Sequence, residues 1–275
     1  MFASPTLVSR KILKENISLL SQKCDRSYDR YVDINKLALF TTNCVVSLCS
    51  GRFLVKLTHA MGIRRKIIEL HEKGVTLHNE GNYREAAKVL EQAKQMAEEN
   101  LDTKDEMRLR VLGYLGEMYI CNGEYMKAQA LLEDILSVQR QETPNVLLAA
   151  TLYALGKCYN NQYKYMDAIR LLKESLSIYQ KYVSANNVRV TDTMDMLGTC
   201  FMGQGNLSDA ERILRECLEI RKSAQPEDPI ADGRLSLAHC LYKQGKQSES
   251  IELTKECVRI SKSHFHPKHF RVASG

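Results

Sequence analysis

Tryptophan is absent from the 275-residue sequence, and aromatic residues make up only 7% of it. Apolar residues nevertheless reach 44%, which suits a helical solenoid with a continuous core of Leu, Ala and Tyr. Long hydrophobic runs are also absent. The longest apolar stretch, residues 37–48, contains Thr41, Thr42 and Asn43 and is shorter than the roughly 18 residues that cross a bilayer. The sequence therefore predicts no membrane-spanning helix.

Motifs that carry catalytic chemistry are missing as well. The chain contains no G-x-S-x-G, no P-loop lysine, no H-E-x-x-H and no Cys-x-x-Cys. The glycine-rich segment at residues 203–205 contains Gly205, which the repeat pattern described below explains as a turn residue. We therefore expect a protein that is not an enzyme and that uses no cofactor and no small-molecule substrate.

Basic residues gather near the N-terminus. Residues 1–65 contain 11 Lys and Arg against 4 Asp and Glu, which leaves the rest of the chain close to neutral. With neither a groove of one sign nor RNA-stacking aromatics, we expect no nucleic-acid partner. Residues 1–14 contain no acid, which is compatible with a mitochondrial transit peptide or with an exposed basic helix. Helices of this leader can also cap the first face of a solenoid.

Residues 194–218 form the pattern around which the rest of the chain is organised. Leu197, Gly198 and Phe201 fall on one helical stripe, and the turn residue Gly205 ends it. A second stripe follows, made of Ala210, Leu214 and Leu218. This segment therefore predicts a helical hairpin.

The hairpin recurs at steps of 40 or 42 residues. The central small residue of the five copies is Gly74, Gly116, Gly156, Gly198 and Ala238. A small residue at this place lets the two helices of a unit approach, and the other apolar positions bury against the next unit. We expect a domain over residues 66–263 with units at about 67–100, 108–141, 148–182, 190–223 and 231–263. Residues 264–275 are interpreted as a linker and the start of a truncated sixth unit, whose exposed apolar face implies either a fragment or a covering partner.

This pattern resembles the tetratricopeptide repeat (TPR). The second copy illustrates the match, with the small residue Gly116, the aromatic Tyr119, the turn residue Gly123 and the paired Ala128. The step is longer than the usual repeat of about 34 residues and, with connections such as residues 142–146, it is similar to the long repeats of the kinesin light chain. The resemblance implies an all-α fold, namely a right-handed superhelical solenoid of TPR helix-turn-helix repeats.

The cysteines and histidines favour structural roles over metal binding. Cys158, Cys200 and Cys240 occupy one repeat position and Cys217 and Cys257 another, which is typical of small buried packing residues. A second candidate metal site is the histidine tract at residues 264–269, with histidines at 264, 266 and 269. A proline at 267 interrupts any helix that would align these histidines, so we expect no metal site.

In the TPR family the first helix of each unit lines a concave groove. The resemblance places the lining positions six and three residues before the central small residue and one, four and five residues after it. The candidate peptide-binding residues are Arg110, Glu117, Tyr153, Lys157, Asn160, Asn161, Asp192, Asp195, Met202, His239, Tyr242 and Lys243. Asn can pair with the backbone of an extended peptide, Lys and Arg with acidic side chains, and Tyr supplies rigid contact area.

The sequence thus predicts a cytoplasmic scaffold or adaptor that binds a protein or linear peptide of mixed charge. The alternative is an organelle assembly factor, for example in mitochondria, that holds a client protein. A cleaved leader would favour the assembly factor, and a retained leader would favour the adaptor. Self-association through exposed end units competes with both.

Overall fold

The computed structural model describes residues 51–224 and 231–264, with side chains at 58–223 and 233–259. Most of the basic leader, the connection at 225–230 and the segment from 265 onward, including the histidines at 266 and 269, lie outside the described residues. Contacts divide the chain into Met1–His59 and Ala60–Gly275, and the helical repeats belong to the second of these units.

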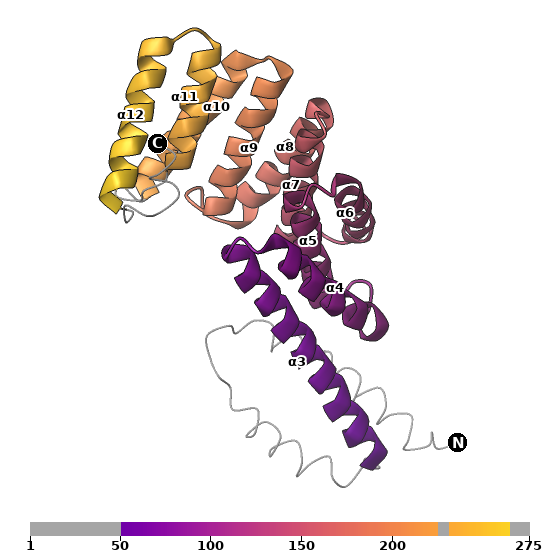
Figure 1. Ribbon diagram of the computed structural model, residues 1–275. Coiled ribbons are helices and arrows are strands. Elements are labelled where there is room, and N and C mark those ends of the chain that lie inside the picture. The colour runs from indigo at the N-terminus through magenta and orange to yellow at the C-terminus, as the bar shows by residue number, and fades with distance from the viewer. Residues whose placement is uncertain (1–50, 225–230, 265–275) are drawn as a thin grey trace. The chain divides into compact units, whose positions relative to one another are not determined.

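All regular secondary structure in the described residues is α-helical (Figure 1). The helices are α3 (Gly51–Asn79), α4 (Tyr83–Asn100), α5 (Glu106–Cys121), α6 (Tyr125–Gln139), α7 (Val146–Asn161), α8 (Tyr165–Tyr182), α9 (Val188–Gln204), α10 (Leu207–Ala224), α11 (Ala231–Lys243) and α12 (Gln247–His264). They form consecutive pairs, α3 with α4 through α11 with α12, and short turns join the two helices of a pair. The predicted all-α solenoid of helix-turn-helix repeats is confirmed. Among the described helices, none is long and apolar enough to cross a membrane.

The central glycine of each of the first four units brings the two helices into close contact. A Cβ atom added at that glycine would lie within 3 Å of a leucine on the second helix, at Gly74 and Leu90, Gly116 and Leu132, Gly156 and Leu172, and Gly198 and Leu214. The fifth unit has Ala238 at the glycine position and Thr254 at the leucine position. Its core also contains Ser250, whose hydroxyl donates a hydrogen bond to the Ala238 carbonyl (2.7 Å). The last hairpin is therefore packed differently from the others.

Different residues determine where a first helix begins and where it ends. Side chains of Asp105, Asn145 and Asn187 accept hydrogen bonds from backbone amides in the first turns of α5, α7 and α9, which satisfies donors that a helix start leaves without partners. The turn into the second helix needs one residue with positive φ. Four units use glycine there, with φ between 79° and 87°, whereas the third unit uses Tyr163 (φ 62°).

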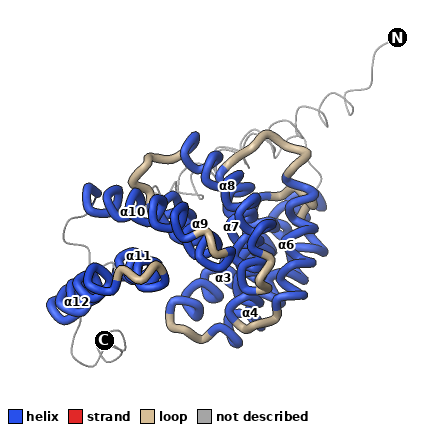
Figure 2. Tube along the Cα trace, turned by 90° about the horizontal axis from the view of Figure 1, so that it is seen from above, coloured by secondary structure: helices blue, strands red, loops and turns tan. Residues whose placement is uncertain are grey.

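The first helices of successive units also contact one another, from α5 to α7, α7 to α9 and α9 to α11. In the view from above, α12 lies outside α11 and α10 lies outside α9 (Figure 2). The first helices therefore share one face of the repeat array, and the second helices back it.

The buried thiols take part in the packing, as the sequence pattern indicates. Cys158 donates to the Tyr125 carbonyl (3.3 Å) and Cys240 to the Leu207 carbonyl (3.5 Å), and each carbonyl belongs to the preceding unit. Cys217 donates to the carbonyl of Thr191 within its own unit (3.3 Å). Among the described residues, no group of His, Cys, Asp and Glu could hold a metal ion.

One pair of positions links each of the first three units to the next, and its chemistry changes along the array. The hydroxyl of Tyr119 donates to Glu91 (3.0 Å), and the hydroxyl of Tyr159 donates to Glu133 (2.6 Å). At the next junction the same two positions hold a phenylalanine and a lysine, Phe201 and Lys173. The Lys173 ammonium lies 5.6 Å from the centre of the Phe201 ring, within range of a cation–π interaction. The hydrogen bond is therefore replaced by another contact that suits both residues.

The tyrosine–glutamate link gives a testable stability change. We expect Tyr159→Phe to lower the free energy of unfolding by about 1 kcal/mol, the usual net value of one hydrogen bond. Burial, followed by the bond to Glu133, raises the Tyr159 pKa from 10.0 to about 12. Wild-type stability should therefore fall between pH 10 and pH 12, because only the unfolded chain loses this proton there, and the variant should lack that part of the fall. Urea unfolding at several pH values measures both effects, with Tyr83→Phe, whose hydroxyl makes no hydrogen bond with described residues, as the unchanged control.

Candidate interaction surface

The predicted groove residues all lie on the first helices, but they differ in exposure. Met202 is buried, with 7% of its surface exposed. The exposed members are Arg110, His239, Tyr242 and Lys243. The half-buried members are Glu117, Tyr153, Lys157, Asn160, Asn161, Asp192 and Asp195. The candidate surface therefore spans α5, α7, α9 and α11.

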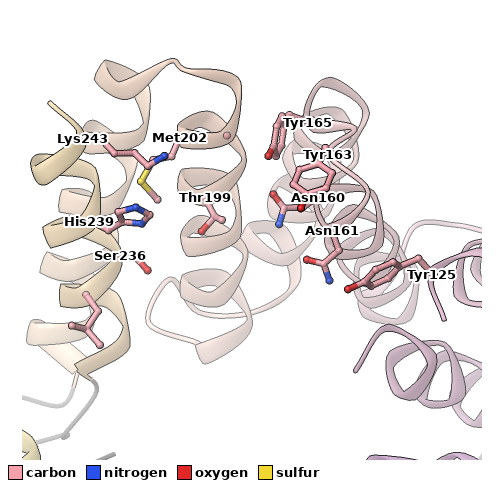
Figure 3. A pocket seen from close by; sticks show the side chains of 12 residues that line it. Tyr125, Asn160, Asn161, Tyr163, Tyr165, Thr199, Met202, Ser236, His239 and Lys243 are labelled. Carbon is pink, nitrogen blue, oxygen red and sulfur yellow. The ribbon is translucent and has the colours of Figure 1, made fainter. Parts of the chain in front are cut away.

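A cavity of about 650 Å³ lies on this face, between α7, α9 and α11 (Figure 3). Five of the predicted residues line it, namely Asn160, Asn161, Met202, His239 and Lys243. The remaining lining residues are Tyr125, Tyr163, Tyr165, Thr199, Gly203, Leu235 and Ser236. In Figure 3 the tyrosines and the two asparagines face Met202, His239 and Lys243 across the cavity.

Among the described residues, the cavity lining contains the cation Lys243, amides and apolar side chains, but no Asp or Glu. Asn160 uses its Oδ1 atom to accept a hydrogen bond from the Cys200 thiol (3.4 Å), which leaves its Nδ2 atom as a donor for a ligand. The side chains of Lys243 and Asn161 make no hydrogen bond or ion pair with described residues. These groups can therefore pair with carbonyl or carboxylate oxygens of a bound chain.

The predicted residues Glu117, Tyr153 and Lys157 lie away from the cavity lining, on α5 and α7. Burial raises the pKa of the Glu117 carboxyl, and the charges of Lys157 and His78 oppose that rise. Burial also raises the pKa of the Tyr153 hydroxyl, and the charge of Asp192 adds to the increase. These side chains form a half-buried polar strip beside the cavity, in which neighbouring charges influence one another.

Asp192 and Asp195 are held by an arginine that the sequence reasoning did not identify. Arg221, on α10, places its guanidinium nitrogens 3.0 Å from Asp192 and 2.6 Å from Asp195. The Arg221 side chain is only 10% exposed, and that of Asp195 is 18% exposed. The negative charge predicted for this part of the groove is therefore largely neutralised within the protein. Arg110 is likewise engaged, by Glu106 one helical turn before it (2.6 Å).

Sequence reasoning missed two kinds of lining residue. Tyr125 and Tyr165 lie at the start of second helices, outside the first-helix positions from which the groove residues are predicted. Tyr163 replaces the turn glycine of the other four units, and that exception was the signal that could have singled it out. Gly203 carried a signal too, because it is a groove position without a side chain.

A family model of the tetratricopeptide repeat matches residues 67–141 and 147–223, which together make up more than half of the chain. The chain belongs to the tetratricopeptide repeat family. TPR proteins are generally non-enzymatic scaffolds for protein–protein interaction, and their units bury apolar faces against neighbouring units, as they do in this TPR protein. No curated protein sequence gives a match.

Several solved structures share the fold of this TPR protein. The nearly identical TPR-like repeats of a Podosopora anserina protein described as a kinesin light chain have 22% identity and a TM-score of 0.62, covering 72% of this chain and 95% of that one. BtubC (BKLC) from P. vanneervenii has 17% identity and a TM-score of 0.60, with coverage of 76% and 93%. A Rap protein in complex with competence and sporulation factor has 15% identity and a TM-score of 0.63, with coverage of 72% and 54%. The fold is thus of the kinesin-light-chain type.

Proposed function

We propose that this TPR protein is a non-enzymatic adaptor that binds a linear peptide of mixed charge along the face of its first helices. The cavity between α7, α9 and α11 carries the proposal, because two amides, a lysine and three tyrosines from three units converge on it. Concave sites with a few convergent polar groups are where ligands usually bind. The bound factor in the Rap structure of the same fold supports this interpretation.

The side chains present suit an extended peptide. Asn160 and Asn161 can donate to and accept from a peptide backbone, and Lys157 and Lys243 can bind acidic side chains. Since Arg221 neutralises Asp192 and Asp195, the half-buried Glu117 remains, among the predicted groove residues, as the acid that can bind a basic residue. The two signs of charge in the peptide would then occupy different parts of the surface.

The test compares capture of partners from a cell lysate by the full chain and by the variant Lys157→Ala, Asn161→Ala, Lys243→Ala. These three side chains make no hydrogen bond or ion pair with described residues, so we expect the variant to keep the helical content and thermal midpoint of the parent. Captured proteins should fall about tenfold, which corresponds to about 1.4 kcal/mol of binding free energy.

The matched control is the variant Lys88→Ala, Arg170→Ala, Arg212→Ala, which removes three exposed cations from second helices. Their ion pairs are exposed and contribute little to stability. Partners should be retained by this variant. Equal capture by both variants and the parent would contradict the groove as the binding site.

The basic leader is the feature that keeps a mitochondrial assembly factor as the alternative function. We propose a cytoplasmic location for the adaptor, and a leader removed by a processing protease would instead favour a mitochondrial assembly factor that holds a client protein. Comparing the N-terminal residue of the mature protein with Met1 separates the two.

A further inference from the structure

The turn of the third unit departs from the other four. Gly81, Gly123, Gly205 and Gly245 adopt positive φ at matched places, and Tyr163 alone among described non-glycine residues does the same. Left-handed backbone is unfavourable for a residue with a bulky side chain, because its Cβ atom approaches the following carbonyl oxygen. A glycine at position 163 would avoid this cost, as it does in the other units.

The contacts of the Tyr163 ring contribute little stability to offset the unfavourable backbone conformation. Its surface is 79% exposed, and its hydroxyl makes no hydrogen bond with described residues. Its contact is with Tyr165, in an edge-to-face arrangement with 6.2 Å between ring centres. Backbone strain of this kind concentrates at places that bind ligands. The strained turn therefore suggests a role outside the stability of the fold.

The neighbouring helix makes room for the tyrosine pair. A Cβ atom added at Gly203, on α9, would lie 2.3 Å from the Cε1 atom of Tyr165. Any larger residue at 203 would displace the Tyr165 ring from its place against α9. A strained turn in the third unit and a missing side chain in the fourth thus combine to hold two aromatic rings at the cavity.

The surroundings of these rings define what can sit against them. Met202, which is buried, and Leu235, which is 45% exposed, supply further apolar surface to the same cavity. No carboxylate lines the cavity among the residues whose side chains are described, so within that set neither aromatic ring has an acid beside it to attract a cationic side chain. Asn160 and Asn161 lie on the helix that leads into the turn, where they can hold a peptide backbone beside the rings (Figure 3).

We propose that Tyr163 and Tyr165 form an aromatic clamp that receives one large apolar side chain, aromatic or long aliphatic, of the bound peptide. The proposal rests on the peptide-binding function proposed above and adds a specificity-determining residue in a turn, outside the first helices. The Tyr163 and Tyr165 rings stand at 82° to each other and supply the two surfaces against which that side chain packs, and Gly203 gives the space for the Tyr165 ring.

The test uses synthetic dodecapeptides selected from a random linear display library on the full chain. Fluorescence anisotropy gives the Kd of each peptide for the wild type, Tyr163→Gly and the control Tyr182→Ala, which removes an exposed tyrosine at the end of α8. We expect one large apolar peptide residue whose change to Ala weakens wild-type binding at least tenfold. In Tyr163→Gly the same peptide change should weaken binding less than twofold, while Tyr182→Ala should behave as the wild type. The urea midpoint of Tyr163→Gly should be unchanged or higher, which excludes unfolding as the cause.

Failure of this inference is distinguishable from failure of the proposed function. Peptides that need Lys157, Asn161 and Lys243 but show no coupling to Tyr163 would overturn the clamp and leave the groove intact. Peptides that ignore all of these residues would overturn both. A dimer of the chain that disappears in Tyr163→Gly would also overturn the clamp, because a second copy would then occupy the aromatic surface.

Discussion

Gly116→Ala is expected to lower the free energy of unfolding by about 2 kcal/mol, whereas Gly113→Ala on the same helix should raise it by up to about 1 kcal/mol. Alanine normally stabilises a helix relative to glycine, and a Cβ atom at Gly113 meets nothing within 4 Å. At Gly116 the same methyl group would lie 2.8 Å from a Leu132 methyl carbon and 2.9 Å from its Cγ atom. The helices must then separate or the leucine must leave its position.

Urea unfolding followed by circular dichroism measures both variants. Two changes of the same sign would contradict close packing at the central glycine. The double variant Gly116→Ala, Leu132→Thr reproduces the residues that the fifth unit has at these positions, Ala238 and Thr254. It should relieve the steric overlap, so its stability should exceed the value obtained by adding the two single changes.

Arg221→Met is expected to destabilise the protein by about 3 kcal/mol, because it leaves the largely buried Asp195 carboxylate without its cation. The control is Arg215→Met on the same helix, whose side chain is 44% exposed and pairs with Glu211 and Glu249. Its cost should stay below about 1 kcal/mol. Equal costs for the two variants would show that the Arg221 pair is no more than a surface contact.

The loss in Arg221→Met should depend on pH. Burial raises the Asp195 pKa above its ordinary value of 3.8, and Arg221 opposes that rise. Without the arginine the folded-state pKa climbs further, so the unfolded chain ionises at lower pH than the folded one. Stability of the variant then falls as pH rises past 3.8, and its deficit relative to the wild type should shrink as the pH is lowered towards that value. Adding Asp195→Asn should recover part of the deficit at neutral pH and flatten its pH dependence.

Most of the fold was predictable because its determinants are local or periodic. The small residue at 74, 116, 156 and 198 and the leucine 16 positions later are visible in the sequence, and the structure places each such pair in contact. The repeat length of 40 or 42 residues could not show whether the helices or the connections between units are longer than in the usual repeat. Here the connections at 101–105, 140–145 and 183–187 are short, and the second helices of the first, third and fourth units each reach 18 residues.

For the candidate surface, the sequence predicts which helix face forms it, but neither the contacts between its side chains nor the turn residues that belong to it. Repeat register places Asp192 and Asp195 on the first helix, but it does not reveal that Arg221, 26 residues after Asp195, reaches back to both. Register also omits the turns, so Tyr163 was absent from the predicted set although it lines the cavity. Which helix a long side chain reaches, and whether a turn residue faces the groove, depend on the three-dimensional arrangement of the helices. The repeat pattern of the sequence does not contain that information.

The changing pair at the junctions between units bears on how such a gene can grow or shrink. Loss of the third unit would set Phe201 against Glu133 and break a matched contact, whereas tandem duplication would set a second Tyr159 against Lys173, where a cation–π contact remains available. Deletion of the whole unit would therefore need a compensating point mutation to restore the match, and duplication would not. Descendants of this sequence should therefore gain a copy of this unit more readily than they lose it.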